Sequence, residues 1–205
     1  MKLINLNTKY LGRNFIFYKK IDSTQNEIFR MINNCKEQGT KLENGTLVMC
    51  DIQEKGKGTH GRKWITDEGG NIAFSMFVET NCLSSKLENI TTKIARILVE
   101  IFREFYNISI DVKLPNDLYI NGKKIGGILT EARVDLGSDV SEKVATTRYL
   151  VIGIGINTSK TSFDDEIKTI ATSIKNEYEI DVDRVKIIGE FCNRFEKIIE
   201  KQIND

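Results

Sequence analysis

The chain has 205 residues, of which 40% are hydrophobic and 29% are charged, and its formal net charge at pH 7 is +1. This composition is typical of a soluble globular domain, and without a long apolar run or a signal-peptide pattern we expect a cytoplasmic protein with no membrane contact. A charge so close to zero argues against a general electrostatic preference for nucleic acid, and one histidine with four scattered cysteines argues against a metal centre. The cysteines are expected to be buried free thiols.

The first half of the chain predicts alternating strands and helices. Residues 14–19 predict a strand, and Thr24 with Glu27 forms a capping-box pattern ahead of a run of apolar residues at helical spacing. Strands are then predicted over 46–52 and 71–79, with a loop rich in glycine and cations between them.

The second half predicts a hairpin among helices. The elements expected there, in chain order, are a long amphipathic helix over 90–105, a strand over 108–114, strands over 117–120 and 124–130, a strand over 144–157, and helices over 164–178 and 183–203. The dipeptide Asn121-Gly122 is typical of a type I′ turn, which makes the strands on either side antiparallel. The sequence therefore predicts an α+β fold, with a mixed, largely antiparallel sheet flanked by helices in a single domain over residues 1–205.

The loop over 56–64, with the sequence Gly-Lys-Gly-Thr-His-Gly-Arg-Lys-Trp, predicts an anion-binding segment. Its three glycines let the backbone approach a ligand closely, while Lys57, Arg62 and Lys63 supply donors for phosphate or carboxylate oxygens. A solvated basic loop is the simpler alternative, because exposed charged loops are common.

The glycines of this loop also match the G-x-G-x-x-G spacing of dinucleotide-binding folds. That fold requires a helix to open at the third glycine, whereas the residues after Gly61 lack a helical apolar stripe and lead into a strand. A dinucleotide site is therefore not expected.

A second group of polar residues lies around the predicted hairpin. Lys113, Asn116, Asp117 and Lys124 would lie close together on adjacent strands, and the pair Gly126-Gly127 would leave space for a ligand on the strand surface. A bulge or tight packing is the alternative explanation for the paired glycines.

In this order, the motifs resemble the catalytic domain of biotin protein ligases, which attach biotin to a lysine of a carrier protein. The matching segments are Asp22-Ser23-Thr24, Gln53, the loop over 56–64, Lys113 to Tyr119, Lys124 to Leu129, and Gly153-x-Gly155-x-Asn157. The resemblance implies a fold related to class II aminoacyl-tRNA synthetases. It also implies a reaction in two steps: biotin and ATP form biotinyl-5′-AMP, and the carrier lysine then takes the biotinyl group.

The resemblance also implies the roles of individual residues. The biotin site would comprise Ser23, Thr24, Gln25, Gln53, Lys57, Gly58, Thr59, Lys124, Gly126 and Gly127. The ATP site would comprise Arg62, Lys63, Trp64, Lys113, Asn116 and Asn157. Catalysis would rest on Lys124, Arg62 and Asp117, with Mg²⁺ accompanying ATP and no separate metal site in the protein. A turn acid that bonds backbone N–H groups is the equally plain alternative for Asp117.

The expected partner is a biotin carboxyl carrier protein or domain, with a homodimer as a further expectation and no DNA binding. Only about twenty residues precede Ser23, too few for a helix-turn-helix domain, and no SH3-like domain is expected after the last helix. Two positions depart from the family pattern: Thr59 stands where some members of the family have an arginine, and Leu114 stands where a tryptophan is often found. A lipoate or octanoate ligase or transferase is the alternative enzyme, and a noncatalytic nucleic-acid-binding protein is the alternative from another class.

Overall fold

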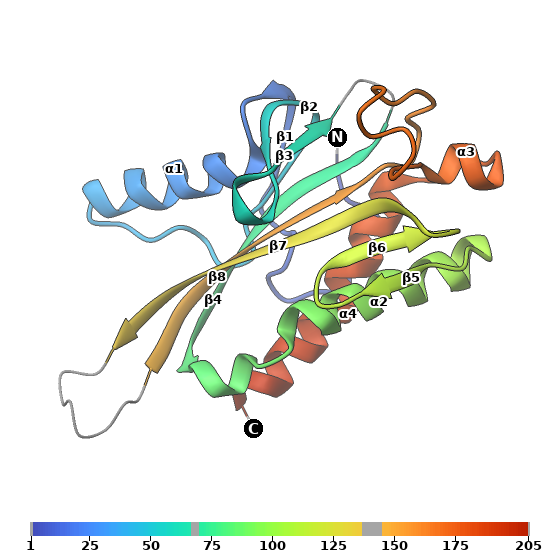
Figure 1. Cartoon of the computed structure of the whole chain (residues 1–205). Coiled ribbons are helices and arrows are strands. Elements are labelled where there is room, and N and C mark those ends of the chain that lie inside the picture. The colour runs from blue at the N-terminus through green and yellow to red at the C-terminus, as the bar shows by residue number, and fades with distance from the viewer. Residues whose placement is uncertain (1, 67–69, 137–144, 205) are drawn as a thin grey trace.

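The computed structural model describes residues 2–66, 70–136 and 145–204, which form one mixed sheet with helices on both faces (Figure 1). The strands are β1 (Phe15–Ile21), β2 (Leu47–Lys57), β3 (Lys63–Thr66), β4 (Ile72–Leu83), β5 (Asp111–Lys113), β6 (Asp117–Ile120), β7 (Lys123–Leu136) and β8 (Ala145–Ile156). The helices are α1 (Thr24–Glu37), α2 (Ile90–Tyr106), α3 (Ile174–Tyr178) and α4 (Arg184–Asn204), with short 3₁₀ helices at Thr59–Gly61 and Ser84–Leu87.

The sheet has the order β1-β2-β4-β8-β7-β6-β5, and β3 pairs with β2 outside this path. Strands β1 and β2 run parallel, whereas the other pairs among the described residues are antiparallel. The expected mixed, largely antiparallel sheet is confirmed. None of the helices in the described ranges is long and apolar enough to cross a membrane.

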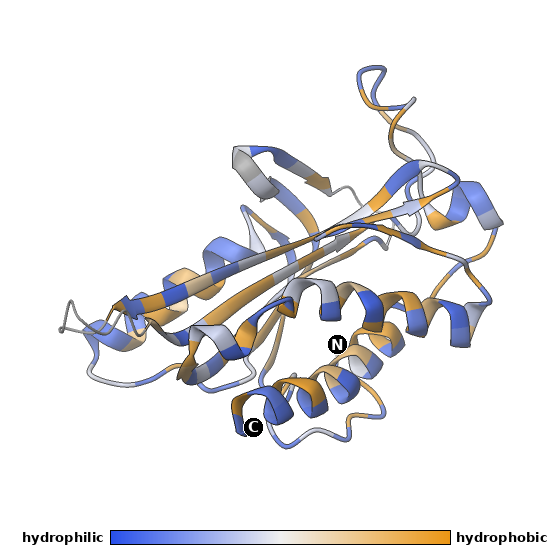
Figure 2. Cartoon of the chain, turned by 60° about the horizontal axis from the view of Figure 1, so that its bottom comes forward, coloured by the Kyte–Doolittle hydropathy of each residue, from blue (hydrophilic) through white to orange (hydrophobic). Residues whose placement is uncertain are grey.

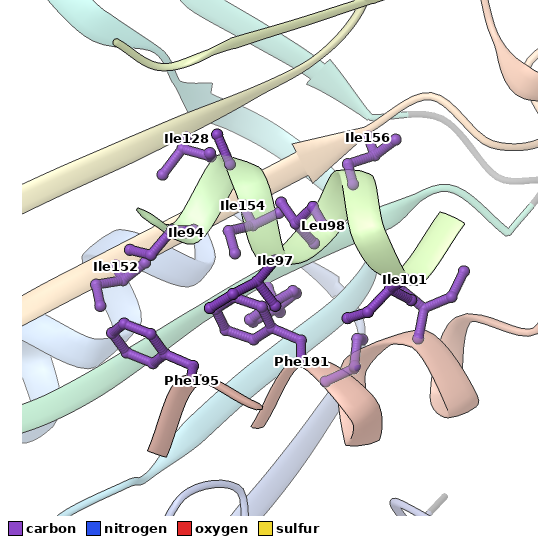
Figure 3. Packing of buried hydrophobic residues seen from close by; sticks show 14 of the residues in the cluster. Ile94, Ile97, Leu98, Ile101, Ile128, Ile152, Ile154, Ile156, Phe191 and Phe195 are labelled. Carbon is purple, nitrogen blue, oxygen red and sulfur yellow. The ribbon is translucent and has the colours of Figure 1, made fainter. Parts of the chain in front are cut away.

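The sheet separates two apolar layers, with α1 on one face and α2 and α4 on the other (Figure 1). On β4, Ile72, Phe74 and Met76 belong to the core on the side of α2 and α4, whereas Phe77 belongs to the smaller core under α1 together with Val151 of β8. Figure 3 shows isoleucines of β8 packed against α2 and the phenylalanines of α4. This alternation follows from the two-residue period of a strand. On the face that carries α1, the part of the sheet next to the start of this helix carries polar residues.

Helix amphipathicity explains why α2 and α4 cover the larger core. Apolar residues recur on one side of each helix, and Figure 2 shows polar residues on the rest of the surface. The N-terminus of α4 is capped by Asp183, whose Oδ1 accepts from the backbone N–H groups of Val185 and Lys186. The helix predicted over 183–203 is therefore confirmed.

The capping box predicted at Thr24 is wrong by one residue. Ser23 has an extended backbone and is the N-cap of α1, because its Oγ accepts from the backbone N–H of Asn26 at 3.4 Å. Glu27 instead accepts hydrogen bonds from Tyr18 and Arg30.

Two other predicted elements differ from the structure. The strand predicted over 108–114 is limited to Asp111–Lys113, and the helix predicted over 164–178 is limited to Ile174–Tyr178. Turns occupy residues 165–170. The backbone that follows forms a β-bridge with Lys124, whose backbone N–H donates to the Ile170 carbonyl and whose carbonyl accepts from the Thr172 N–H. Ser173 then caps the short helix. Residue 144, at the start of another predicted strand, lies outside the described residues.

Candidate functional site: two pockets joined at Lys124

A first pocket, with about 480 Å³ of empty space partly open to solvent, lies at the start of α1 over strands β4, β8, β7 and β6. Its lining comprises Ser23, Thr24, Gln25, Gln53, Lys57, Gly58, Thr59, Trp64, Phe74, Ser75, Asn116, Asp117, Lys124, Gly127, Ile128, Leu129, Gly153, Ile154 and Gly155. The pocket therefore combines an apolar floor with polar groups at both ends, a composition suited to a small molecule with separate apolar and polar parts.

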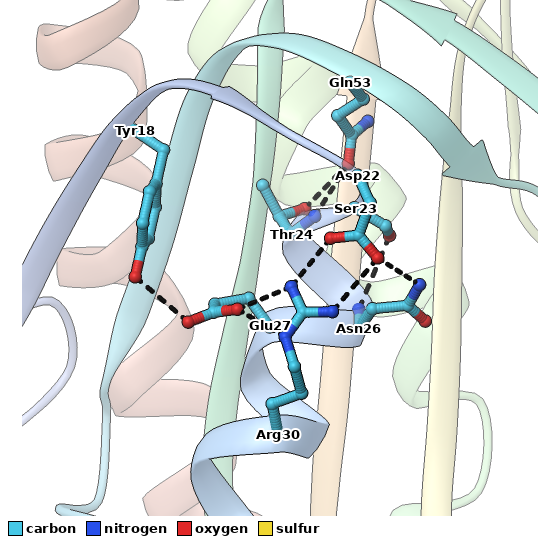
Figure 4. A network of polar contacts seen from close by, with 8 residues as sticks. All are labelled: Tyr18, Asp22, Ser23, Thr24, Asn26, Glu27, Arg30 and Gln53. Carbon is cyan, nitrogen blue, oxygen red and sulfur yellow. Dashed lines mark hydrogen bonds and ion pairs between the residues drawn. The ribbon is translucent and has the colours of Figure 1, made fainter.

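A carboxylate network fixes the turn that enters α1 (Figure 4). Arg30 donates two hydrogen bonds to Asp22, at 2.7 and 3.0 Å, and Asn26 donates a third at 2.9 Å. Hydrogen bonding from Arg30 holds the pKa of Asp22 well below its usual range. The network orients Ser23 and Thr24 at the pocket wall.

A chain of neutral groups forms the polar end of the first pocket. Ile21 is the register partner of Gln53, so the end of β1 brings Thr24 next to Gln53. The Gln53 Oε1 accepts from the Thr24 backbone N–H at 2.9 Å and from its hydroxyl at 3.1 Å, and the Thr24 hydroxyl lies 2.8 Å from that of Ser75. These groups can exchange hydrogen bonds with an uncharged polar ligand.

The other end of the pocket carries a half-buried ion pair. The Nζ of Lys124 lies 2.7 Å from Asp117 Oδ1, and both side chains are largely shielded from solvent. Between β6 and β7 the register places Leu118 opposite Gly126 and Tyr119 opposite Lys124, so Ile125 is an extra residue on β7. Such a bulge re-aims the neighbouring side chain, and here the Lys124 ammonium turns over Gly127.

Glycines on the α1 face give the pocket its shape. A β-carbon at position 155 would lie 2.5 Å from the Trp64 ring, one at 153 would lie 2.7 Å from Gln25 Oε1, and one at 127 would contact Lys124. Gly126 differs, because a β-carbon there would point into the core at 2.9 Å from the Gly155 carbonyl oxygen. The two glycines thus face opposite sides of the sheet: Gly127 faces the pocket, whereas Gly126 faces the core and does not line the pocket.

The basic loop is a ribbon formed by the end of β2 and by β3. Gly56 pairs with Trp64, and a β-carbon at position 56 would lie 2.2 Å from the Trp64 carbonyl oxygen, so this glycine serves strand packing rather than ligand approach. Gly61 has a positive φ of 72° and turns the chain back. The Arg62 guanidinium donates to the hydroxyl and carbonyl oxygens of Thr59, so the residue that departs from the family pattern holds Arg62 in place.

A second pocket, with about 880 Å³ of empty space, lies on the other side of Trp64. Its lining comprises Gly58, Thr59, Arg62, Lys63, Trp64, Ile65, Lys124, Asn157, Lys160, Phe163, Ile167, Ile170 and Ala171. The lining combines cations, among them Arg62 and Lys63, with apolar side chains such as Phe163, a set suited to a ligand with charged and aromatic parts. Lys124, Trp64, Gly58 and Thr59 line both pockets.

The wall of the second pocket is a strap over residues 158–172. Asn71 Oδ1 accepts from the backbone N–H groups of Thr158, Ser159 and Lys160, and the Thr158 hydroxyl donates to the Gly70 carbonyl. At the far end, the Asn157 amide donates to the Thr172 carbonyl oxygen at 3.2 Å. The strap is therefore anchored to β4, β7 and β8.

Most of the site residues expected from the sequence come together. The residues expected to bind biotin line the first pocket, apart from Gly126, and those expected to bind ATP line the second pocket, apart from Lys113 and Asn116. Asn116 lines the first pocket and donates to the Ile128 carbonyl oxygen. Lys113 is exposed on β5, with its ammonium 5.9 Å from the centre of the Tyr119 ring.

Sequence reasoning missed the strap and one polar wall residue. Ile167 and Ile170 fall within the helix predicted over 164–178, but together with Phe163 they line the second pocket instead. Ser75 alternates with core residues on β4, so its position in that strand placed it on the pocket face without showing its contact with Thr24.

The cysteines play no part in either pocket. All four are free thiols, and Cys50, Cys82 and Cys192 are buried as expected, whereas Cys35 is partly exposed. Burial raises the pKa of Cys50 to about 12, which keeps this thiol protonated and unreactive at neutral pH.

This sheet and its site define the class of protein. The chain matches the structure of "Biotin protein ligase from Aquifex aeolicus in complex with biotin and ATP" with a TM-score of 0.68 and 29% identity, over 92% of this chain and 71% of that one. The expected fold of the class II aminoacyl-tRNA synthetase type is thereby confirmed. The family model for the biotin/lipoate A/B protein ligase family matches residues 17–157, and the chain belongs to that family.

Named relatives agree with this assignment. The "Bifunctional ligase/repressor BirA" of Bacillus subtilis is 34% identical over 194 residues, which cover 94% of this chain and 55% of the relative. The Escherichia coli protein of the same description is 27% identical over 164 residues, or 80% of this chain and 46% of that protein. The chain thus spans about half the length of these relatives.

Proposed function

We propose that this chain is a biotin protein ligase, which activates biotin with ATP and transfers the biotinyl group to a lysine of a biotin carboxyl carrier protein. The observation that carries the proposal is the position of Lys124, the lysine that lines both pockets. Two anionic substrates must approach each other there, and a partly buried cation offsets their repulsion and stabilises the charge that grows on the phosphoryl oxygens. Similarity to the biotin- and ATP-bound Aquifex aeolicus structure supports the same reading.

In the first step, an oxygen of the biotin carboxylate attacks the α-phosphorus of ATP. The bond from that phosphorus to the bridging oxygen breaks, and pyrophosphate leaves with the electron pair. We assign the neutral wall of Thr24 and Gln53 to the ureido end of biotin, and Lys124 to the carboxylate and the reacting phosphoryl group. Arg62 and Lys63 then bind ATP phosphates, with Trp64 and Asn157 toward the nucleotide.

In the second step, the carrier lysine first loses one ammonium proton to water, and its neutral amine then attacks the acyl carbon. The bond from that carbon to the phosphate oxygen breaks, AMP leaves with the electron pair, and a second proton passes from the nitrogen to water. Asp117 holds the Lys124 ammonium at 2.7 Å, which orients the cation toward the junction. The same carboxylate is placed to attract the incoming lysine, which arrives mostly protonated near neutral pH. The carrier partner, the homodimer and a cytoplasmic location are parts of the proposal that the family resemblance supports.

Magnesium enters this proposal with ATP. The described residues include no group of three His, Cys, Asp or Glu side chains placed to hold a metal. Mg²⁺ is commonly bound through substrate phosphates and water with few protein ligands, so we assign it to the triphosphate and give it no ligand in the chain.

Biotin-dependent exchange of labelled pyrophosphate into ATP tests the proposal. We expect exchange with biotin and none with lipoate or octanoate, followed by labelling of a carrier domain at one lysine. Exchange supported by lipoate or octanoate, but not by biotin, would instead assign the chain to the lipoate branch of the family. Exchange that ignores all three acids would contradict both assignments.

A further inference from the structure

The amide of Gln25 is fixed in one orientation by two acceptors. Gln25 is 3% exposed, and its Nε2 donates to Glu131 Oε2 at 2.8 Å and to the Val151 carbonyl oxygen at 3.1 Å. A carboxylate and a carbonyl can only accept, so the NH₂ group of the amide must face them. The Gln25 Oε1 is therefore directed to the opposite side.

That oxygen is a buried acceptor, with no hydrogen-bond partner among the described residues. It lies 2.7 Å from the point where a β-carbon of residue 153 would stand, and the Ser75 Oγ lies 3.3 Å from the same point. Gly153, Gln25 and Ser75 all line the first pocket. The bare α-carbon of Gly153 thus leaves room beside this buried, unpaired acceptor at the wall of the pocket.

The other glutamine of this pocket is arranged differently. The Gln53 Oε1 already accepts two hydrogen bonds from Thr24, and its Nε2 donates to the Thr66 hydroxyl. Of these two glutamines, Gln25 is therefore the one whose amide oxygen accepts no hydrogen bond from the described residues. A ligand with an N–H group would satisfy it, whereas a hydrocarbon chain would bury it unpaired, which is unfavourable.

We propose that Glu131 is a positioning residue that acts through Gln25 and makes the first pocket select a ureido ring over a straight acyl chain. Glu131 does not line that pocket; it lines a neighbouring cavity that shares Lys57 and Leu129 with the first pocket. By accepting from Gln25 Nε2, it keeps Oε1 on the side of Gly153 and the pocket wall. The inference rests on the proposed function, because it takes biotin to be the occupant of the first pocket.

The test compares Glu131→Met, which removes the acceptor, with Glu131→Gln, which keeps an acceptor oxygen at the same chain length. We expect Glu131→Met to raise the KM for biotin in pyrophosphate exchange about tenfold while kcat changes less than about twofold. Glu131→Gln should stay within about threefold of the wild type. Inhibition by octanoate should be the same in all three proteins, because its chain offers no N–H.

A double variant shows whether Glu131 acts through Gln25. Glu131→Met combined with Gln25→Met should be no worse for biotin than Gln25→Met alone. Additive losses, an unchanged biotin KM in Glu131→Met, or an equal loss of octanoate inhibition would overturn the positioning role. Should Glu131→Met not fold, Glu131→Thr serves instead, since threonine favours strands and is too short to reach Gln25.

The wild type separates this inference from the function on which it rests. Absence of biotin-dependent exchange in the wild type would overturn the proposed function and the inference with it. Exchange in the wild type with unaltered variants would overturn the inference alone.

Discussion

Gly126 and Gly127 are neighbours in β7, but their missing side chains belong to opposite faces of the sheet. A β-carbon at 126 would meet backbone oxygen and core side chains at 2.9 to 3.3 Å, whereas one at 127 would lie at 3.6 to 3.7 Å from Asp117 and Lys124. The sequence motif predicted a ligand role for both glycines, because it does not reveal which residue of a pair faces the core.

Substitution of each glycine by alanine tests this difference. Gly126→Ala should lower the free energy of unfolding by about 1–3 kcal/mol, because the backbone at Gly155 cannot easily yield. Gly127→Ala should change it by less than about 0.5 kcal/mol but raise the KM for biotin, because the methyl group contacts the Lys124–Asp117 pair. Urea unfolding and pyrophosphate exchange measure the two effects. The reverse pattern would contradict the assignment of faces.

Asp22 gives the fold a predictable dependence on acid. Its pKa is lowered in the folded protein, chiefly by hydrogen bonding from Arg30, so its stabilising contribution is complete above the unfolded value near pH 4 and is lost as the pH falls below it. Asp22→Asn should cost on the order of 1 kcal/mol at pH 7, and the difference from the wild type should shrink steadily below about pH 4. Unfolding free energies at a series of pH values check this. A difference that is constant or larger at low pH would contradict it.

At the scale of elements, the strands and the long helices follow from periodicity, whereas the strap and the bulge do not. Alternation predicted β4 and β8 because their apolar residues fill one core. The helix predicted over 164–178 is wrong for residues 165–170, because Ile167 and Ile170 line a pocket and the backbone at 170–172 pairs with Lys124. The extra residue in β7 lies directly before the glycine pair, for which a bulge was the alternative explanation. The pair does not reveal that the bulge aims Lys124, since this follows from the pairing with β6.

Substitution of Asn71 tests whether the strap contributes to stability and to the second pocket. Asn71→Ala removes an oxygen that accepts three backbone N–H groups, so it should lower the free energy of unfolding by about 1–3 kcal/mol and raise the KM for ATP more than that for biotin. Asn71→Asp is the matched control, because it keeps the acceptor and gives up only an Nδ2 that has no partner among the described residues. Steady-state kinetics with each substrate varied in turn separate the effects. An equal rise in both KM values would show that the strap does not belong to the nucleotide pocket.

At the scale of the whole molecule, the N-terminal segment is held to α4 by one buried carboxylate. Glu196 is 5% exposed and accepts from the backbone N–H groups of Lys9, Tyr10 and Leu11. The segment thereby closes the end of the core that α4 covers. Sequence patterns located the α4 helix but not this contact, because the partners are more than 180 residues apart in the chain.

Glu196→Ala should lower the free energy of unfolding by about 3 kcal/mol, which corresponds to about 6–12 °C in Tm, because buried N–H groups lose their acceptor. Glu200→Ala is the control, since Glu200 pairs with the exposed ammonium of Lys9 and should cost less than about 1 kcal/mol. Thermal unfolding of both variants tests the claim. Similar Tm values for the two would mean that the buried carboxylate is not the anchor.

The motifs located most residues of the first pocket and the cations Arg62 and Lys63 of the second, because each motif lies on a strand end or turn that the pattern also predicted. The sequence does not show that the two pockets adjoin, because their walls come together only in the folded sheet. Lys124 lines both pockets. The most direct measurement is therefore the amount of biotinyl-5′-AMP formed in a single turnover, with enzyme in excess over biotin, by the wild type, Lys124→Ala and the neighbouring control Lys123→Ala. We predict full conversion by the wild type and by Lys123→Ala, and a rate lowered by at least about a hundredfold in Lys124→Ala. Formation of the adenylate at the wild-type rate in Lys124→Ala would contradict the central role of the junction.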